Sequence, residues 1–378
     1  MDKINTKNTT DGMFMAMVKA AMTGSELRVK PTDDEWTQLF RMSRKHAVVG
    51  LLWSVASKHK MPMTLAVQWS SEAEQIRGLN GLMNDEAARL TEAFRNWGIK
   101  TAILKGQANA RLYNDPLVRQ PGDIDIWVEG GKERVMELLI EMGFTQPQDL
   151  KGRNRRNIVN NYHVHLPTND RGVDVEVHFS PSSGNHNPLT NKYLQRWLET
   201  EVKHIEETED GFSVPLLKFA LVMQLAHIQH HFLNSGVGLR QICDYYLLLK
   251  HSTADDRQEV KGLLNQFGLR RIGGALMWVL AEVFGLDNAL MLCKPDKYRG
   301  KWLLRFIMAE GNFGYYAQHV KVKSDVAYFL KKEYRRLKLL PFAPSEIMWL
   351  ELRHWKDLFG LLPERIERGR LSLRNIRR

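Results

Sequence analysis

The sequence predicts an α+β fold in which a small mixed β-sheet is flanked by an N-terminal and a C-terminal helical region. Apolar residues recur every three to four positions from 13 to 84, and again from about 213 onward. Alternating apolar and polar segments separated by turn residues occur only in between. We therefore expect a helical region at 1–84, a mixed core at 85–210, and a helical domain with a basic tail at 211–378.

The composition is that of a globular protein with an anionic partner. The chain has 378 residues, of which 43% are hydrophobic, enough for a sizeable core in two or three domains. The net charge of +11 and the pI near 9.5 favour binding to a nucleotide, a nucleic acid or a membrane surface.

The sequence also excludes several classes of protein. Cys243 and Cys293 are the two cysteines, too few for a disulfide framework or a four-cysteine zinc site. Lys19 interrupts the N-terminal apolar run, which argues against a secretory signal. The apolar stretch 273–286 is too short to span a bilayer and contains Glu282. These features indicate a protein of the reducing cytoplasm with no membrane span.

In the N-terminal region, residues 36–58 have the spacing of one helix with a single apolar stripe. Met61-Pro62 is expected to end this helix. The stripe is best interpreted as packing surface, and its members are Leu39, Met42, His46, Val49, Leu52 and Trp53.

The mixed core is expected to begin with a helix and a strand. Gly98 ends a helix at 85–98, and IKTAILK at 99–105 reads as a strand. The remaining expected elements, in order, are a turn at Lys105-Gly106, a short helix at 107–113, a loop at 114–122, a strand at 123–128, a helix at 131–143, and a hairpin of 161–167 with 172–181 around the turn 168–171.

The C-terminal region is expected to be helical and basic. Helical spacing is clear in 214–233, 238–250 and 273–285. KKEYRRLK at 331–338 is followed by Arg365, Arg368, Arg370, Arg374, Arg377 and Arg378. This tail could bind nucleic acid, although solvated basic helix ends are more common.

The strand at 123–128 carries two carboxylates. Because side chains alternate along a strand, Asp123 and Asp125 share one face while Ile124 and Ile126 enter the core. The two charges repel, which raises both pKa values unless a cation lies between them. Mg²⁺ is bound by one or two carboxylates together with substrate phosphates, so the pair is a candidate metal site that needs a third ligand.

The hairpin offers that ligand. Asp174, Glu176 and His178 share one face of its second strand. A symmetrical turn would place Glu176 opposite His163 and Asp174 opposite His165. The alternative is an ordinary solvent-facing side of an antiparallel hairpin.

Lys105 and Gly106 stand where a strand turns into a helix. A glycine there lets backbone amides approach an anion, and Lys105 would add a positive charge for a triphosphate. The pattern of a P-loop is absent.

Taken together, these segments resemble the nucleotidyltransferase superfamily of the DNA polymerase β type. More closely, they resemble the bacterial family of uncharacterised nucleotidyltransferases. The matching residues are LKG at 104–106, Tyr113, Pro116, Arg119 before DIDIWV, EVH at 176–178, and, more weakly, HIQHHF at 227–232 with LRQICDYYLLL at 239–249.

The resemblance covers about residues 85–250 and implies a nucleotidyltransferase core. It implies that Asp123 and Asp125 hold Mg²⁺ and that Gly106 admits the triphosphate. It also implies that Glu176 is the third carboxylate, with Asp174 as the rival, and that His230 and Asp244 line the nucleotide or acceptor pocket.

Two departures from the superfamily pattern concern the triphosphate. Gln107 replaces the usual Ser or Gly after the turn glycine, and the interval from Gly106 to Asp123 is longer than usual. Lys105 and Arg119 are expected to compensate by neutralising the triphosphate.

Histidines raise a zinc alternative. His227, His230 and His231 share one helical face, which is more typical of a core or solvated face than of a zinc site. His163, His165 and His178 on the hairpin are the candidate ligands of a zinc hydrolase.

We therefore expect a Mg²⁺-dependent nucleotidyltransferase, in which Mn²⁺ can substitute. It would move a nucleoside monophosphate from ATP or another NTP to the hydroxyl of a small molecule, RNA or protein, and release pyrophosphate. Asp123, Asp125 and Glu176 would be catalytic. The alternative is a non-catalytic nucleotide- or RNA-binding regulator, as in a toxin–antitoxin pair.

Overall fold

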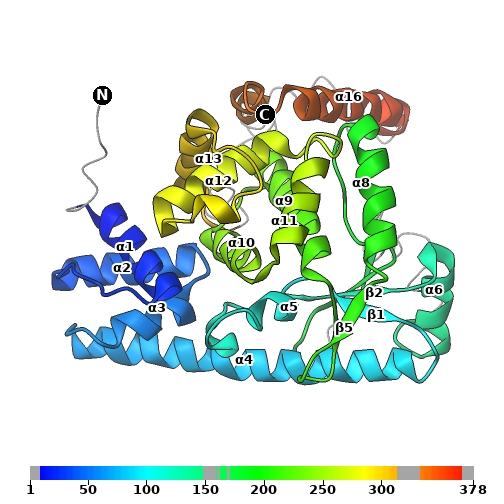
Figure 1. Cartoon of the computed structure of the whole chain (residues 1–378). Helices are drawn as coiled ribbons and strands as arrows, with labels where there is room; N and C mark the ends of the chain where they lie inside the picture. The colour runs from blue at the N-terminus through cyan, green and yellow to red at the C-terminus, as the bar shows by residue number, and fades with distance from the viewer. Residues whose placement is uncertain are drawn as a thin grey trace.

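The computed structural model describes residues 9–146, 148, 159, 162–167, 171–312 and 333–367, with side chains up to residue 356. It is a mixed α+β fold in which a small sheet lies between a long helix and the C-terminal helices (Figure 1). The predicted fold class is confirmed. The turn residues 168–170 and the basic tail from Arg368 onward lie outside the described residues.

Three helices open the chain, namely α1 (Thr10–Thr23), α2 (Asp33–Lys45) and α3 (Val49–Ala56). The prediction of one helix over 36–58 is wrong, because Ala47 adopts a positive φ of 56° and separates α2 from α3. The turn buries His46 against Phe14 of α1. Tertiary packing therefore overrides a continuous helical pattern here.

Helix α4 (Met63–Arg95) is 33 residues long and runs along one side of the molecule (Figure 1). The helix predicted at 85–98 is the last third of α4, which ends at Arg95. Its buried residues Trp69 and Ile76 belong to the helical core, whereas Leu90 and Phe94 belong to the core under the sheet. One helix thus connects the N-terminal helices to the sheet.

The sheet has the order β1-β2-β4-β3, and its strands are β1 (Thr101–Ile103), β2 (Ile124–Val128), β3 (His163–His165) and β4 (Val175–His178). β2 is antiparallel to β1 and parallel to β4, so the sheet is mixed, as predicted. Ile124 and Ile126 are buried in the apolar cluster shared with α4 and α6 (Gly131–Glu141). The opposite face is left for polar side chains.

The hairpin register differs from the prediction by two residues. His163 pairs with His178, and His165 pairs with Glu176. Since β4 also pairs with β2, the turn alone does not determine its register. A two-residue shift keeps every side chain on its expected face, because side chains alternate with a period of two.

The remaining elements are partly connections around the sheet and partly the C-terminal helices. They are α5 (Gln107–Ala110), η2 (Pro116–Val118), α8 (Pro188–Glu201), β5 (Ile205–Glu207), β6 (Ser213–Pro215), α9 (Leu217–Asn234), α10 (Leu239–His251), α11 (Ala254–Leu263), α12 (Arg270–Phe284), η3 (Asn288–Leu290), α13 (Lys297–Glu310) and α16 (Pro344–Glu367). Helical structure was expected from about residue 213, but residues 213–215 form strand β6, which pairs with β5 in a short hairpin.

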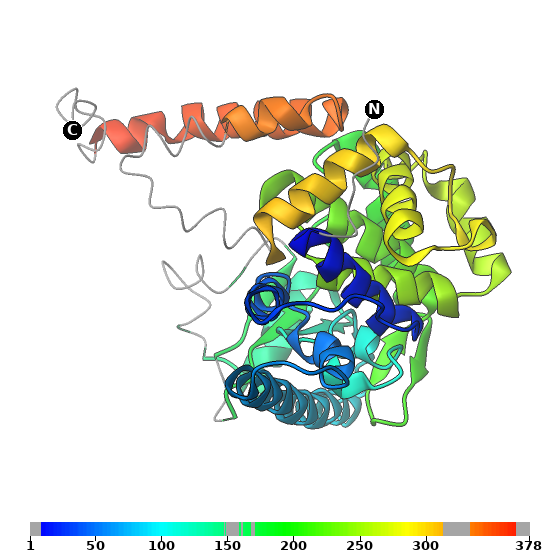
Figure 2. The ribbon, with the colours of Figure 1, turned by 90° about the vertical axis from the view of Figure 1, so that its left-hand side faces the viewer.

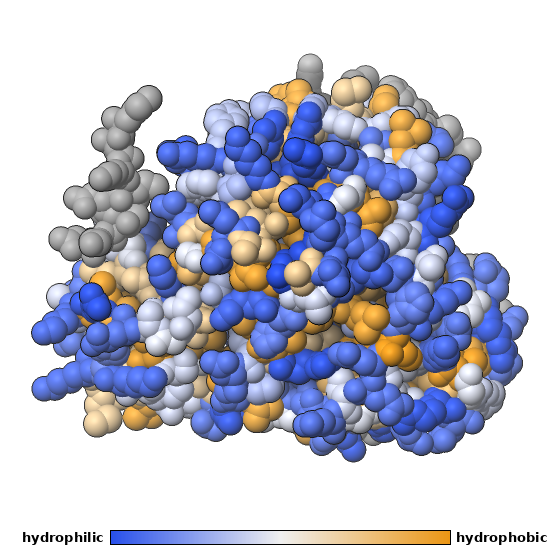
Figure 3. Space-filling model, viewed as in Figure 1, coloured by the Kyte–Doolittle hydropathy of each residue, from blue (hydrophilic) through white to orange (hydrophobic). Residues whose placement is uncertain are grey.

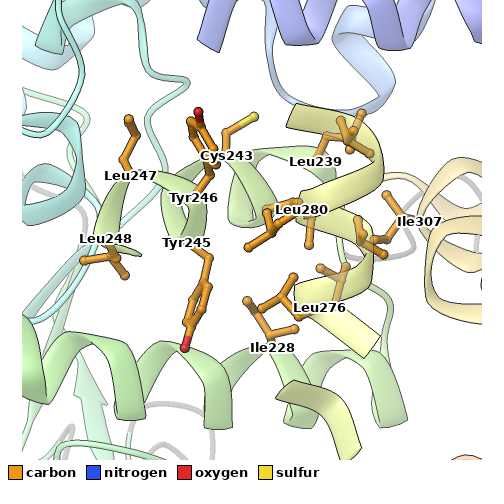
Figure 4. Close-up of a cluster of buried hydrophobic side chains, with 14 of the residues drawn as sticks. Ile228, Leu239, Cys243, Tyr245, Tyr246, Leu247, Leu248, Leu276, Leu280 and Ile307 are labelled. Atoms are coloured by element: carbon orange, nitrogen blue, oxygen red, sulfur yellow. The ribbon is translucent and has the colours of Figure 1, made fainter. Parts of the chain in front are cut away.

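The C-terminal helices share one apolar core with α1, α2, α3 and the first part of α4, and Tyr245 of α10 and Leu276 and Leu280 of α12 belong to it (Figure 4). Helix α16 lies at the outer edge of the C-terminal helices (Figure 2). The visible surface is mainly hydrophilic, with scattered apolar side chains (Figure 3). In the described part of the chain, no helix is long and apolar enough to cross a membrane.

Two arginines of the basic segment 331–338 are used within the protein. Arg335 pairs with Glu310 and donates to the carbonyls of Phe232 and Leu233. Arg336 is buried and pairs with Glu333 and Glu351. These contacts join the segment to α9, α13 and α16, which makes these two side chains poor ligands for nucleic acid.

Candidate active site

The polar face of the sheet brings three carboxylates together. β2 and β4 run parallel with Asp125 directly beside Glu176, and Asp123 precedes β2. Ligand oxygens of Asp123, Asp125 and Glu176 all lie within 4.8 Å of one another. Two separated segments therefore meet at one point, and this arrangement suits a cation that prefers oxygen ligands.

Asp174 lies differently. Its backbone carbonyl accepts a hydrogen bond of 2.9 Å from the amide of Ile124, while its side chain is exposed. Among the described residues it is not part of the carboxylate group. The geometry therefore favours Glu176 over Asp174 as the third acid.

Asp125 is held between two cationic or proton-donating groups. Lys105 Nζ lies 2.9 Å from its Oδ2, and His178 Nε2 lies 2.9 Å from its Oδ1. Burial alone would raise the pKa of Asp125, but Lys105 and the hydrogen bond from His178 outweigh burial and lower it. Both pKa values were expected to rise unless a cation lies close by, and at Asp125 the ammonium of Lys105 supplies that positive charge.

For Asp123 that expectation is confirmed. The neighbouring charge of Asp125, followed by burial, raises the pKa of Asp123. Lys105 contributes one positive charge to a site with three carboxylates, and the attraction of Asp125 and Asp123 raises the pKa of Lys105 against its burial. The site holds an excess of negative charge, which a bound cation would relieve.

Three histidines surround Glu176. His163 Nδ1 and His165 Nδ1 each lie 3.3 Å from its carboxylate, and His178 Nε2 lies 3.5 Å away. Burial lowers the pKa of His163 to about 4. Contacts with Asp125 and Glu176 raise the pKa of His178 although the ring is buried. His163, Glu176 and His178 thus face inward, whereas His165 and Asp174 on the same side of the hairpin are exposed.

Gly106 occupies a position that favours glycine. Its φ is +65°, and a Cβ there would lie 3.3 Å from the carbonyl oxygen of Asp123. The close approach places the turn after β1 next to the start of β2. Helix α5 that follows has only four residues, so its dipole is small.

Gln107 turns away from this site. Its side chain is buried and donates a hydrogen bond to Asn84 on α4. The residue that departs from the superfamily pattern therefore anchors the turn to α4.

Arg119 and Asp244 form a buried ion pair. Arg119 Nε and Nη2 donate to the two oxygens of Asp244 at 2.9 and 2.8 Å, and Tyr113 donates its hydroxyl at 2.8 Å. Burial would raise the pKa of Asp244, but Arg119 lowers it. Arg119 was expected to neutralise the triphosphate. These contacts favour a structural role instead, because Asp244 already balances the charge of Arg119.

Arg240 is a residue that the sequence reasoning did not select. It is buried, and its Nη1 donates to the carbonyls of Gln120 and Pro121 in the loop before β2. Burial, followed by the charge of Arg119, lowers the pKa of Arg240 to about 10. Its position four residues before Asp244 on one helical face was the available signal.

Two cavities adjoin the carboxylates. The larger, of about 260 Å³, is lined by Tyr162, Glu176 and His230, among others. The smaller, of about 30 Å³, is lined by Gly106, Arg240 and Asp244, among others. The walls common to both are Lys105, Asp123, Asp125 and His227.

The histidines of α9 line the larger cavity. Burial lowers the pKa of His227, of His230 and of His231, the last to about 3. Their rings are uncharged at neutral pH, and they form a polar wall of the cavity. His230 thus lines the larger cavity and Asp244 the smaller, and both cavities border Asp123 and Asp125.

Comparison with known proteins gives one family match. The family described as "Uncharacterised nucleotidyltransferase" matches residues 32–285. No curated protein matches the sequence significantly. Among solved structures, an antigenic nucleotidyltransferase-like protein from Paracoccidioides brasiliensis is 16% identical, with a TM-score of 0.32 over 57% of this chain and 94% of that one. A likeness this weak adds nothing about the chain.

Proposed function

Because the chain belongs to the family of uncharacterised nucleotidyltransferases, we propose that it transfers a nucleoside monophosphate from an NTP to an acceptor hydroxyl and releases pyrophosphate. The observation that supports this proposal is the group of Asp123, Asp125 and Glu176, whose ligand oxygens lie within 4.8 Å of one another. Mg²⁺, or Mn²⁺ in its place, fits this set of oxygen donors.

Asp123, Asp125 and Glu176 are the residues that would hold the metal. When bound, it would stabilise the charge that develops on the phosphoryl oxygens during in-line displacement. The excess of negative charge and the raised pKa of Asp123 fit a site that is completed by a cation.

The protein's own groups divide the remaining work. In the displacement the acceptor oxygen bonds to the α-phosphorus, and the bond from this phosphorus to the pyrophosphate oxygen breaks. Glu176, at the wall of the larger cavity, accepts the proton of the acceptor hydroxyl. Lys105 borders both cavities and balances charge on the phosphates.

The positioning of the phosphates would depend on the turn after β1. Gly106 lets the backbone approach an anion without a side chain in the way. Arg119 would act indirectly, because its pair with Asp244 anchors the loop that leads to Asp123. Arg240 supports the same loop through the carbonyls of Gln120 and Pro121.

Incubation of the protein with Mg²⁺ and each radiolabelled NTP tests this function, since self-transfer or hydrolysis releases labelled pyrophosphate even without the natural acceptor. The matched variants are Glu176→Gln and Asp174→Asn on the same strand face. Release should fall at least about 10²-fold in Glu176→Gln and stay near wild type in Asp174→Asn. Equal release from wild type and Glu176→Gln would refute the assignment.

A non-catalytic regulator would give a different result. It would bind an NTP, measured by equilibrium dialysis, yet release no pyrophosphate with Mg²⁺ or Mn²⁺. The three carboxylates argue against this alternative, because closely spaced like charges destabilise a fold that has no use for them.

A further inference from the structure

A second set of metal-binding atoms overlaps the carboxylate group. The cross-strand pairs of β3 and β4 place His163 beside His178, and His165 beside Glu176. Ligand atoms of His163, Glu176 and His178 all lie within 4.8 Å of one another. This set contains two imidazoles, whereas the first contains carboxylates alone.

The spacing of these atoms suits a small tetrahedral ion. His163 Nδ1 lies 3.3 Å from Glu176 Oε2, and His178 Nε2 lies 3.5 Å from the same oxygen. In a tetrahedral zinc site with bonds of about 2.0–2.1 Å, neighbouring ligand atoms lie about 3.3–3.4 Å apart. Two edges of such a tetrahedron are therefore already present.

His165 contacts two of these ligands without belonging to the set itself. His165 Nε2 lies 2.9 Å from His163 Nε2, and its Nδ1 lies 3.3 Å from Glu176 Oε1. If the Nε2 of His163 carries the proton and donates a hydrogen bond to the Nε2 of His165, the Nδ1 of His163 presents its lone pair toward Glu176. Histidines that bind metals are held in this way, with the second ring nitrogen hydrogen-bonded to a neighbour.

We propose that His163, His178 and Glu176 form a site for Zn²⁺ that excludes the catalytic metal and so inhibits the protein. Imidazole nitrogens favour Zn²⁺ over Mg²⁺, which requires oxygen ligands. Glu176 belongs to both sets, so the two ions compete for its carboxylate. Zn²⁺ would also take the His178 nitrogen that contacts Asp125. The inhibition rests on the proposed nucleotidyl transfer, whereas the zinc site rests on geometry alone.

The structure gives a different set of zinc ligands from the one expected from the sequence. The sequence analysis named His163, His165 and His178 as the three candidate ligands of a zinc hydrolase. In the structure Glu176 takes the third place, and His165 lies behind His163.

Zinc binding is tested on the metal-free full-length chain by competition with a chromophoric chelator. Wild type should bind one Zn²⁺ per chain, and His163→Ala should bind it at least about tenfold more weakly. Asp123→Asn, which removes a carboxylate of the other set and none of the three zinc ligands, should weaken zinc binding less than His163→Ala does. His204→Ala, an exposed histidine paired with Glu201, serves as the matched control. Unchanged affinity in His163→Ala would overturn the site.

X-ray absorption of zinc-loaded wild type covers the case in which His163→Ala does not fold. The spectrum should show imidazole scattering from two histidines and no sulfur ligand, and a spectrum without histidine scattering rejects the site. Stoichiometric Zn²⁺ should also suppress Mg²⁺-dependent pyrophosphate release in wild type. Zinc binding without suppression would reject the inhibition while leaving the site, and an inactive wild type that still binds zinc would count against the proposed function alone.

Discussion

Two buried carboxylate groups of this protein differ in how their charge is balanced. Asp244 of α10 has Arg119 across both of its oxygens and the hydroxyl of Tyr113 beside it. Asp123, Asp125 and Glu176 share the single positive charge of Lys105 and the imidazole of His178. The first group is complete within the protein, whereas the second holds an excess of negative charge.

The difference separates a structural site from a functional one. A balanced pair fixes the chain, and its removal leaves a buried charge without a partner. An unbalanced group costs stability in the free protein and gains it back when a cation binds. Burial alone does not make this distinction, since Asp125 and Asp244 are 1% and 2% exposed.

The largest expected effect is on activity at the unbalanced group. Asp123→Asn should lower Mg²⁺-dependent pyrophosphate release by about 10³-fold, because one metal-binding charge is lost. Its free energy of unfolding without metal should stay equal or rise, since repulsion with Asp125 is relieved. Urea denaturation with chelator, alongside the activity assay, measures both. A large loss of stability would place Asp123 in the structural class.

At the balanced group the effect should be on stability. Asp244→Asn leaves the buried charge of Arg119 without its partner and should lower the free energy of unfolding by about 3–5 kcal/mol. The control is Asp296→Asn, which breaks a partly exposed pair with Arg299 and should cost at most about 1 kcal/mol. Urea denaturation of the three proteins measures the difference. Equal costs would contradict the comparison.

The pH dependence of stability should have opposite signs at the two groups. The folded pKa of Asp123 lies above its unfolded value, so the folded state binds more protons between the two values, and stability falls as pH rises through this window. The folded pKa of Asp244 lies below 3.8, so its contribution is present above 3.8 and is lost only as pH falls through the folded value.

Urea denaturation without metal between pH 4 and 7 can separate these contributions. The stability of Asp123→Asn relative to wild type should increase with pH and then level off. The deficit of Asp244→Asn should stay constant over the same range. A deficit of Asp244→Asn that shrinks as pH rises would show a raised folded pKa, and hence a charge that Arg119 does not hold.

The smallest expected effect concerns the turn that carries Lys105. Gly106→Ala should cost about 1–2 kcal/mol, because alanine is strained at a φ of +65°. Gly81→Ala in α4 meets no atom within 4 Å and should instead stabilise the protein by about 0.5–1 kcal/mol. Thermal unfolding of both variants measures this contrast, and two changes of the same sign would argue against strain at Gly106.

Much of the sheet and of the candidate site could be predicted from local pattern. The alternation of Asp123 and Asp125 with Ile124 and Ile126 was sufficient to predict a strand with one polar face, which the structure bears out. Glu176 was expected on the neighbouring polar face. The hairpin register was wrong by two residues, because pairing with β2 helps to determine it and a turn sequence does not contain that information.

Other features could not be predicted from local pattern, because they depend on contacts between residues that are far apart in the sequence. The break at Ala47 has no glycine or proline to mark it. The ion pair of Arg119 with Asp244 joins residues 125 positions apart, so the sequence could not show that the charge of Arg119 is already balanced. The same holds for Arg240 and its carbonyl partners in the loop before β2.

By itself the sequence determined which side chains share a face, since alternation along a strand and the spacing of a helix are local properties of the backbone. Only the tertiary structure decided which charges meet. A buried carboxylate becomes a structural anchor or a cation ligand according to the partners that folding brings within a few ångströms, and for Asp244 and Asp125 those partners come from different elements.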